Sequence, residues 1–516
     1  MRANTLPSKK INLLNGKEKM PREDRKDVRL IIVSNRLPII LSRGKDGQWH
    51  IQPGSGGLVT ALAPVLRNRG GIWIGWPGIT NDEKINTESI LRNETKEFGY
   101  TLKPVELTPE EKEKYYKGFA NEIIWPLFHD FIAHCKFKPE YWFAYQQVNW
   151  KFAETIKENV KNSDFIWVHD YHLMGVGKEL RNLGIKNSMA FFLHIPFPPP
   201  DVFIRLPWRF QILNFLLEYD LIGFQTLRDR RNFVQCIRQF GKGYRIVGKG
   251  QIGKLVVGDR EIRIGALPIS IDFKEMAEKS ATREVTEKAW SIHSDFTDQK
   301  IILGIDRLDY SKGIPERLRA FRNCLRRFPE LRNKITLVQI VVPSRRDIEK
   351  YADLKIEIER LVGEINGQFT LPGWVPIHYL FRSLDEKELI AYYRTSEIAL
   401  VTPLKDGMNL IAKEYCASNL EETGVLIMSE FAGAASQFQR NALLVNPHDI
   451  EGMAQAIHQA YYMSKEERKS RMRKLRQNVR KYNIFWWVDS FLQAAIEKNL
   501  DSFPLMEEYM PTVDIK

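Results

Sequence analysis

Two cations stand five residues apart where an apolar run of the sequence ends. The stretch LGIDRLDYSKGIP carries Arg307 and Lys312 directly after the run KIILGI. A guanidinium offers a planar fork of donors and an ammonium a compact charge, a combination that suits a diphosphate. The loop also precedes a predicted helix, whose free N–H groups favour anions. We therefore predict an anion site here, although solvated loop charges would fit the two residues taken alone.

A second polar segment, VTPLKDGMNLIAKEY, follows another apolar run. It contains the turn pair Asp406-Gly407 and then a helical pattern that carries Glu414 two turns further on. An ordinary turn and an amphipathic helix would have the same pattern. Two carboxylates close to a diphosphate, however, indicate recognition of hydroxyl groups on a sugar and a ribose.

The motif WVHDYHL ends a third apolar run with His169, Asp170 and His172. Its spacing matches no standard zinc motif. On a strand, residues 170 and 172 share one face and residue 169 points to the other. A buried polar cluster, or an aspartate that holds a substrate hydroxyl, is favoured over a metal site. The glycine turn GSGGL at 54–58 is not a GxGxxG motif, and a plain turn is the simpler interpretation.

Short apolar runs rich in β-formers alternate with helical patterns from residue 30 onward. Examples are RLIIVSN, DFIWVHD and SMAFFLHIP in the first half, and KIILGID, KITLVQIVV and GVLIMSEF in the second. Continuous apolar strands alternating with helices predict parallel sheets covered on both faces, and so an α/β fold. The polar, helical stretch 268–300 separates the runs into two domains. Ligands of such sheets bind beyond the carboxyl ends of the strands, where the polar motifs above lie.

Composition limits the protein class without choosing a ligand. The chain has 516 residues, 43% of them apolar, and a net charge of +13, which permits nucleic acid, an anionic membrane or anionic small molecules as partners. Its four cysteines are far apart, which fits a reducing compartment. The sequence has no apolar run long enough to cross a bilayer and no signal-peptide pattern, so we expect a soluble cytoplasmic protein without membrane partners.

The strongest basic segment is KEERKSRMRKLRQNVRK, residues 465–481. Met472, Leu475 and Val479 fall at helical spacing, which predicts one buried stripe and a solvated basic face. The sequence has no RNP, KH or zinc-finger signature. We therefore expect no nucleic-acid partner.

Nine motifs in one order resemble the trehalose-6-phosphate synthase family of retaining glycosyltransferases. They are VSNRLP, SGGLVTAL, YYKGFANEIIWPLFH, WVHDYHL, FFLHIPFP, DLIGFQT, DRLDYSKG, LVTPLKDGMNLIAKEY and SEFAGAA, between about residues 29 and 500. The resemblance implies a GT-B fold, with two Rossmann-like domains facing across a cleft. The expected units are a flexible basic tail (1–27), an N-terminal acceptor-side domain (28–270), a C-terminal nucleotide-sugar domain (271–470) and helices that cross back (471–516).

The resemblance also implies roles for particular residues. Arg307 and Lys312 would bind the diphosphate, Glu414 the ribose, and Asp406 with nearby amides the donor glucose. His194 would contact the sugar being transferred, and Asp170 would lie at the junction with the acceptor. We expect the catalytic residues to be His194, Asp170, Arg307, Lys312 and Asp406. The donor site is expected to include, besides three of these, Gly57, Gly407, Met408, Asn409, Leu410 and Glu414. The acceptor phosphate is expected to lie among Arg36, Tyr116, Trp125 and Arg345.

The implied reaction moves glucose from a nucleoside-diphosphate-glucose to glucose 6-phosphate, with no metal and no cofactor. The donor base is open among UDP, ADP and GDP. Lys405 stands where arginine is frequent in the family, and the segment 197–240 departs from the sequence that is commonest in the family. An alternative is therefore a glucosylglycerol-phosphate synthase with glycerol 3-phosphate as acceptor, and a less favoured one is a catalytically silent sugar-phosphate-binding regulator. Relatives commonly form dimers or tetramers, so we expect a homo-oligomer.

Overall fold

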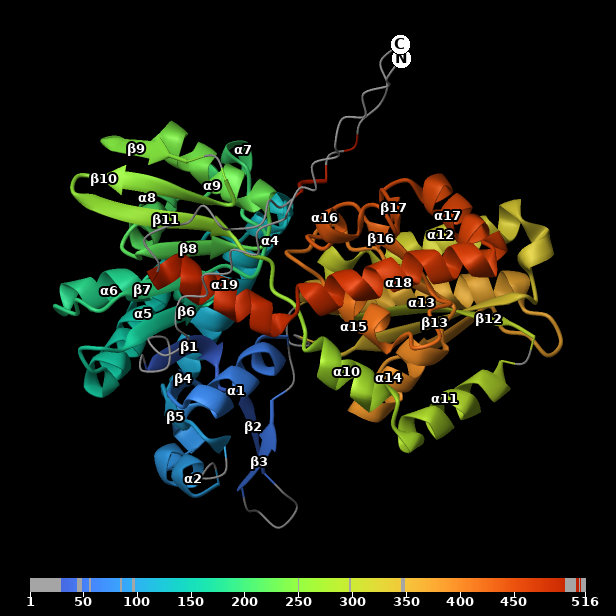
Figure 1. The fold of residues 1–516 in the computed structure, drawn as a ribbon, viewed down its shortest axis with the longest axis horizontal. Helices are drawn as coiled ribbons and strands as arrows, with labels where there is room; N and C mark the ends of the chain where they lie inside the picture. Colours follow the sequence, from blue (N-terminus) through green and yellow to red (C-terminus); the bar gives the residue numbers. More distant parts are fainter. Residues whose placement is uncertain are drawn as a thin grey trace, which may run out of the picture.

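The computed structural model describes residues 29–43, 49–54, 57–83, 86–94, 98–248, 250–296, 298–344, 349–496, 507–509 and 511. The expected tail over residues 1–27 lies outside this part of the chain. The described residues form two α/β domains side by side, and helix α19 (Ile484–Ile496) runs from the second domain onto the first (Figure 1). The predicted alternation of parallel strands and helices is confirmed.

The first domain is built on one twisted sheet, whose described strands follow the order β5-β4-β1-β6-β7-β8-β11-β10-β9. Neighbours are parallel from β5 to β11, whereas β10 and β9 extend the sheet by antiparallel pairing. A separate antiparallel pair, β2 and β3, precedes α1. The strands are β1 Leu30–Arg36, β2 Ile39–Arg43, β3 Trp49–Pro53, β4 Ile72–Trp76, β5 Thr101–Pro104, β6 Phe165–His169, β7 Met189–Phe192, β8 Leu221–Phe224, β9 Tyr244–Val247, β10 Ile252–Val257 and β11 Arg260–Ala266.

Helices cover both faces of this sheet, and alternate residues of each strand face them. Ile31 and Val33 of β1 pack with the layer that contains η4, α5, α6, α8 and α9, whereas Leu30 and Ile32 pack with α1 and α19. The helices are α1 Gly57–Arg69, α2 Thr87–Glu94, α3 Pro109–Glu111, the π-helical η4 Lys112–Ile124, α4 Trp125–Phe128, α5 Pro139–Asn159, α6 Val176–Asn182, α7 Pro200–Phe203, α8 Arg209–Leu216 and α9 Leu227–Phe240.

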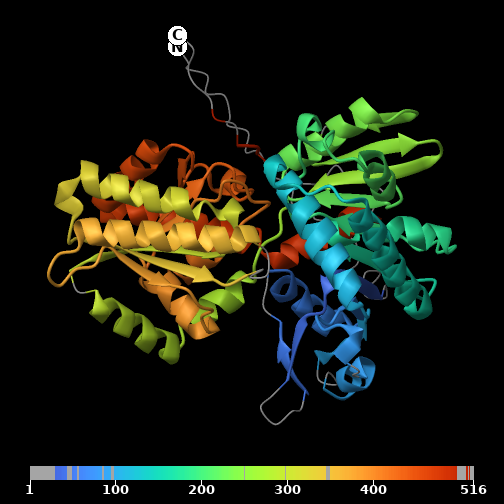
Figure 2. The same ribbon diagram turned by 180° about the vertical axis from the view of Figure 1, so that it is seen from behind.

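The second domain has an all-parallel sheet in the order β14-β13-β12-β15-β16-β17. Helices α12, α13 and α17 cover one face, seen in front in Figure 2, and α14, α15 and α18 cover the other. The strands are β12 Lys300–Arg307, β13 Ile335–Val342, β14 Ile377–Leu380, β15 Ile398–Val401, β16 Val425–Ser429 and β17 Leu443–Val445. The helices are α10 Phe273–Ser280, α11 Arg283–Asp295, α12 Ile314–Arg327, α13 Glu349–Phe369, α14 Glu386–Thr395, α15 Leu410–Ser418, α16 Ala435–Phe438, α17 Ile450–Tyr462 and α18 Lys465–Lys481.

The chain crosses between the domains twice, after β11 and again between α18 and α19. The expected boundary at residue 471 falls inside α18, which packs on α15 and β16 of the second domain. Beyond it, α19 packs on β8, β11 and α1 of the first domain. Trp487 is fully buried there, donates its indole N–H to the Leu267 carbonyl at 2.9 Å, and lies 5.1 Å from the Trp167 ring. Trp487 therefore anchors α19 on the first domain.

Helix α18 has the predicted apolar stripe, since Met472, Leu475 and Val479 are all buried. Its basic face is only partly solvated, which corrects the prediction. Arg476 is buried and donates to the carbonyls of two residues in the last turn of α15, and Arg468 likewise caps the end of α17. Cations at helix carboxyl ends satisfy carbonyls that lack partners within the helix. Part of the basic charge therefore has a structural function.

Candidate active site

The expected diphosphate-binding cations lie at the carboxyl end of β12. Arg307 is the last residue of β12, and its exposed guanidinium makes no hydrogen bond or ion pair with any other described residue. Lys312 ends the short helix η7 (Tyr310–Lys312), which is capped by the buried carboxylate of Asp309. Gly313 follows in the left-handed region (φ 63°), and α12 begins at the next residue. The free N–H groups of that helix therefore open beside the two cations.

Lys312 reaches across to the loop that follows β15. Its Nζ donates to Asp406 Oδ2 at 2.6 Å, and the two side chains are only 13% and 15% exposed. Asn409 Nδ2 donates to the same oxygen at 3.2 Å, and the Met408 N–H donates to Oδ1 at 3.3 Å. Burial alone would raise the pKa of Asp406, but the charge and hydrogen bond of Lys312, with smaller contributions from His129 and Asn409, together outweigh burial and lower the pKa. Asp406 is therefore an ionised acceptor.

A buried ion pair lies under these two loops, and sequence reasoning missed it. Arg317 of α12 contacts Asp306 at 2.7 Å, and both side chains are essentially unexposed. The guanidinium also donates to Thr402 Oγ1 at 3.0 Å and to Gln339 Oε1 at 3.2 Å. It thereby connects β12, β13 and the end of β15. A charge inside a helix pattern gives no sequence signal of burial, because most arginines are exposed.

Gly407 places the second domain directly against the first. A Cβ added to this glycine would lie 2.2 Å from the carbonyl oxygen of His194 and 3.1 Å from the Ile195 Cα. The neighbouring Asn409 adopts φ 73° and caps α15 by accepting from the Ala412 N–H, so α15 starts at Leu410. The amides expected to bind the donor glucose thus belong to a tight turn between strand and helix.

Glu414 lies one turn into α15 and is held by a tyrosine of α14. Tyr393 is buried and donates its hydroxyl to Glu414 Oε2 at 2.9 Å. Burial raises the pKa of Glu414, and the Tyr393 hydrogen bond opposes that rise. The tyrosine was not predicted, because the two helices carry the pair 21 residues apart.

On the first domain, Asp170 and His194 follow the adjacent strands β6 and β7. Asp170 has φ 74°, and its Oδ1 accepts from the backbone N–H of His194 at 3.2 Å. The His194 imidazole lies 3.1 Å from the ring of His169, between Nε2 and Nδ1 respectively. Burial lowers the pKa of His194 to about 3, so the ring is neutral at physiological pH.

The expected acceptor residues lie on β1, η4 and α4. The Arg36 guanidinium stands 4.5 Å from the Trp76 ring centre, and the Tyr116 ring lies 5.6 Å from the same indole. Trp125 lies 5.9 Å from the Tyr171 ring. The structure therefore brings Arg36 and Tyr116 together around one tryptophan that sequence reasoning did not select.

Two expected site residues are less fully placed. Arg345 lies outside the described residues. Gly57 is the first residue of α1, a helix N-terminus, where an anion is favoured.

Further contacts join the domains beside the site. Lys405 forms an ion pair with Asp130, whose φ is 68°, across 275 residues of sequence. Tyr310 of η7 packs against the rings of Phe131 and His134 at 4.9 and 4.8 Å. The loops that carry Lys312 and Asp406 therefore each contact the first domain directly.

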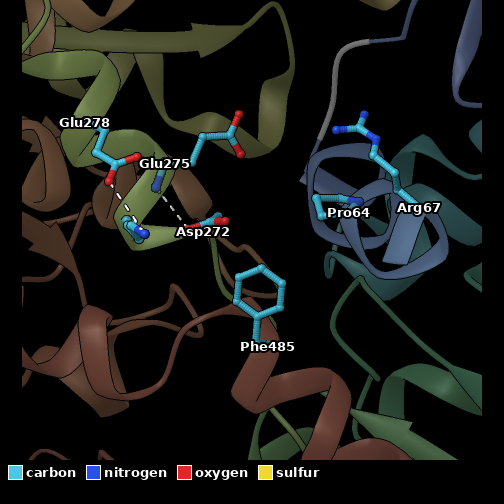
Figure 3. A pocket seen from close by; sticks show the side chains of 7 residues that line it. Pro64, Arg67, Asp272, Glu275, Glu278 and Phe485 are labelled. Carbon is cyan, nitrogen blue, oxygen red and sulfur yellow. Dashed lines mark hydrogen bonds and ion pairs between the residues drawn. The ribbon is translucent and has the colours of Figure 1, made fainter. Parts of the chain in front are cut away.

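A separate cavity of about 470 Å³ lies near the crossing segments (Figure 3). Pro64 and Arg67 of α1 form one wall, and carboxylates of α10 form the other, with Phe485 of α19 between them. It contains none of the expected substrate residues. Within the described residues, no group of three or more His, Cys, Asp or Glu side chains is arranged to hold a metal ion. Over the same part of the chain, no helix has the length and apolar character needed to cross a membrane.

Known proteins share both the sequence and this architecture. The family model described as glycosyltransferase family 20 matches residues 28–497. The trehalose-6-phosphate synthase of Mycobacterium leprae is 42% identical over 481 residues, covering 91% of this chain and 95% of that protein, and that of Mycobacterium tuberculosis H37Rv is 41% identical over 479 residues, covering 91% and 94%.

Solved structures agree in fold. A Burkholderia xenovorans α,α-trehalose-phosphate synthase (UDP-forming) in complex with glucose-6-phosphate has a TM-score of 0.81 and 34% identity, covering 90% of this chain and 99% of that one. An E. coli structure bound with UDP-2-fluoro glucose also has a TM-score of 0.81, with 35% identity and coverage of 90% and 98%.

Two Rossmann-like domains whose strand ends meet around Asp406, Gly407 and His194 define a glycosyltransferase of GT-B fold. The chain belongs to glycosyltransferase family 20. The predicted fold, the enzyme class and the resemblance to the trehalose-6-phosphate synthase family are confirmed.

Proposed function

We propose that this enzyme transfers glucose from UDP-glucose to glucose 6-phosphate with retention of configuration, forming α,α-trehalose 6-phosphate. The observation that carries the proposal is the pairing of Lys312 with Asp406 beside Arg307, which pairs with no other residue in the described part of the chain. This arrangement sets cations for a diphosphate next to an ionised acceptor for sugar hydroxyls. The substrates named for the Burkholderia and E. coli relatives support the choice of acceptor and donor base.

Each group has a role in this proposal. Arg307 and Lys312 bind the diphosphate and stabilise the negative charge that develops on it as the glycosidic bond breaks. Asp406 orients the donor glucose through its hydroxyls, and Glu414 accepts from the ribose. No cofactor takes part, and the protein cations neutralise the leaving group.

The acceptor enters from the first domain. Its phosphate is bound by Arg36 and Tyr116, and we assign Trp125 and Arg345 to the same role from the family resemblance. Its attacking hydroxyl approaches the same face of the sugar that the diphosphate leaves, near Asp170 and His194. The contacts of Gly407 and Lys405 with the first domain close the site and exclude water, which limits hydrolysis of the donor.

The alternative acceptor, glycerol 3-phosphate, is not favoured, because the relatives above are trehalose-6-phosphate synthases over nine-tenths of this chain. A competition assay tests the point. Purified enzyme receives glucose 6-phosphate and glycerol 3-phosphate together, with UDP-, ADP- and GDP-glucose, and products are identified by mass spectrometry. Trehalose 6-phosphate and UDP support the proposal, and proton NMR of the product gives the anomeric configuration. Glucosylglycerol phosphate, or no product, refutes it.

A matched pair of arginine variants tests the site. Arg307→Ala should reduce kcat/KM by about 10²–10³-fold, the usual loss when one preorganised donor is removed. Arg283→Ala is the control, because that side chain is 91% exposed on α11. Near-normal turnover by Arg307→Ala would remove the arginine from the mechanism. Adding a chelator should leave wild-type turnover unchanged.

A further inference from the structure

His169 is a buried histidine that the proposed chemistry does not use. It ends β6, is completely unexposed, and is bordered by Trp167 at 4.7 Å and Trp487 at 6.4 Å between ring centres. Its one polar contact with a described residue is that of Nδ1 with His194 Nε2, at 3.1 Å. Its other nitrogen, Nε2, is buried with no hydrogen-bond partner among the described residues.

The contact fixes how the two rings share protons. Burial holds the pKa of both histidines far below neutrality, so each ring carries a single N–H. A hydrogen bond between two neutral imidazoles requires a proton on one facing nitrogen and a lone pair on the other. Either His169 donates and His194 accepts, or the reverse.

The surroundings of His169 decide between these arrangements. If His194 donated, the single proton of His169 would sit on Nε2, leaving an N–H buried without an acceptor, which proteins rarely tolerate. The indole N–H of Trp167, two residues earlier on the same strand face, is also buried and has no partner in the described part of the chain. A proton on His169 Nε2 would add a second buried donor without a partner, whereas a lone pair there adds none. The proton therefore belongs on His169 Nδ1.

We propose that His169 is a positioning residue that donates to His194 Nε2 and so makes His194 present Nδ1–H, an uncharged hydrogen-bond donor, to a hydroxyl oxygen of the sugar being transferred. His194 Nδ1 makes no hydrogen bond to another described residue, so this N–H is free for a ligand. An uncharged donor suits the step, since an imidazolium would repel the positive charge that develops on the sugar. The inference rests on the proposed function for the identity of the ligand, but the tautomer itself does not.

The tautomer is tested first, without substrate. The full chain is labelled with 15N-histidine, and the His194 signals are identified by their loss in His194→Gln among the ten histidines. In the wild type, His194 should show a protonated Nδ1 and an unprotonated Nε2. In His169→Phe, which keeps an aromatic ring, although a larger one, and removes both nitrogens, His194 should become a mixture of tautomers. A wild-type His194 protonated on Nε2 overturns the proposal. Because no turnover is needed, this result is independent of whether the proposed reaction is right.

Turnover by matched variants completes the test. His169→Phe should lower kcat by about 10–100-fold, as loss of an orienting partner commonly does, with KM values changed less than about 3-fold. His169→Asn, whose Nδ2–H can occupy the position of Nδ1–H, should recover most of the loss. His378→Phe on β14 is the control. Unchanged kcat in folded His169→Phe, or no recovery by asparagine, overturns the proposal.

Thermal unfolding separates positioning from a merely structural role. His169→Phe removes a buried nitrogen that lacks a partner but also leaves His194 Nε2 without its donor, so its melting temperature should fall slightly, whereas His169→Asn keeps the donor and should melt close to the wild type. If His169→Phe and His169→Asn both lose kcat and both melt below the wild type, the effect is structural and the proposal is overturned.

Discussion

Gly407→Ala tests how closely the two domains must approach for transfer. In the structure a Cβ at this position would lie 2.2 Å from the His194 carbonyl oxygen, and real Cβ contacts below 3.0 Å essentially do not occur. The obstacle is backbone, which no rotamer change can relieve. The glycine turn and the β7 loop must therefore separate by about 0.8 Å. A misplacement of about 1 Å at a reacting centre costs on the order of 10²-fold in rate, so we expect kcat/KM to fall by about that factor.

The assay compares transfer with binding of UDP alone. If the alanine acts as a wedge between domains, UDP should still bind to the second domain with an affinity within about 10-fold of the wild type by calorimetry. Gly363→Ala on α13 is the control, because its Cβ would meet open space and the exchange favours the helix by about 1 kcal/mol. A kcat/KM within about 3-fold of wild type would refute the wedge. Equal losses of UDP binding and transfer would place the effect inside the donor loop.

Three other variants follow from single contacts. Lys405→Ala should lower kcat/KM about 3–10-fold. A double-mutant cycle with Asp130→Ala should give a coupling energy of only about 0.2–1 kcal/mol, because Asp130 is 43% exposed. A coupling energy of zero would contradict the contribution of this ion pair. Tyr393→Phe removes the hydrogen bond that opposes the raised pKa of Glu414, so the acid limb of donor affinity, where the carboxylate protonates, should move to higher pH. Burial lowers the pKa of Lys413 to about 7. Between pH 7 and 10 the lysine is therefore protonated in the unfolded chain but neutral in the folded one, so the free energy of unfolding should rise with pH by up to about 1.4 kcal/mol per pH unit. Lys413→Met should flatten this slope in denaturant titrations.

Sequence patterns predicted most central strands of both sheets and the edge strand β17, but not β11 or the other sheet edges. Apolar runs such as KIILGID and DFIWVHD are buried on both faces, so composition alone identifies them. The antiparallel strands β9 and β10, and the edge strands β5 and β14, carry half-buried or exposed residues and were not predicted. An edge strand is stabilised mainly by pairing with its neighbour, and that pairing is not written in its own residues.

The candidate site shows the same division between local and distant information. Placing Arg307 and Lys312 at a strand end needed only the order of residues, and the structure agrees. The partners of the site residues needed the fold: Tyr393 for Glu414, and His169 for His194. Strand alternation did place residue 169 opposite 170, but what lies on that side depends on the register between β6 and β7.

The first crossing segment shows why the domains are held in a defined relation. Its carbonyls at Leu267, Ile269 and Ile271 alternate along an extended backbone, and each is bound by a different group. Trp487 donates to the first at 2.9 Å, Lys413 to the second at 2.8 Å, and the first N–H of α19 to the third at 2.9 Å. Since all three carbonyls are buried among apolar side chains, breaking any one leaves a polar group unsatisfied, at about 1–3 kcal/mol. Domain opening that keeps these bonds must therefore bend around this segment, and the donor helix α15, which carries Lys413 next to Glu414, moves with it. The contact of Gly407 with the first domain, made by the loop that leads into α15, is a second restraint between the domains.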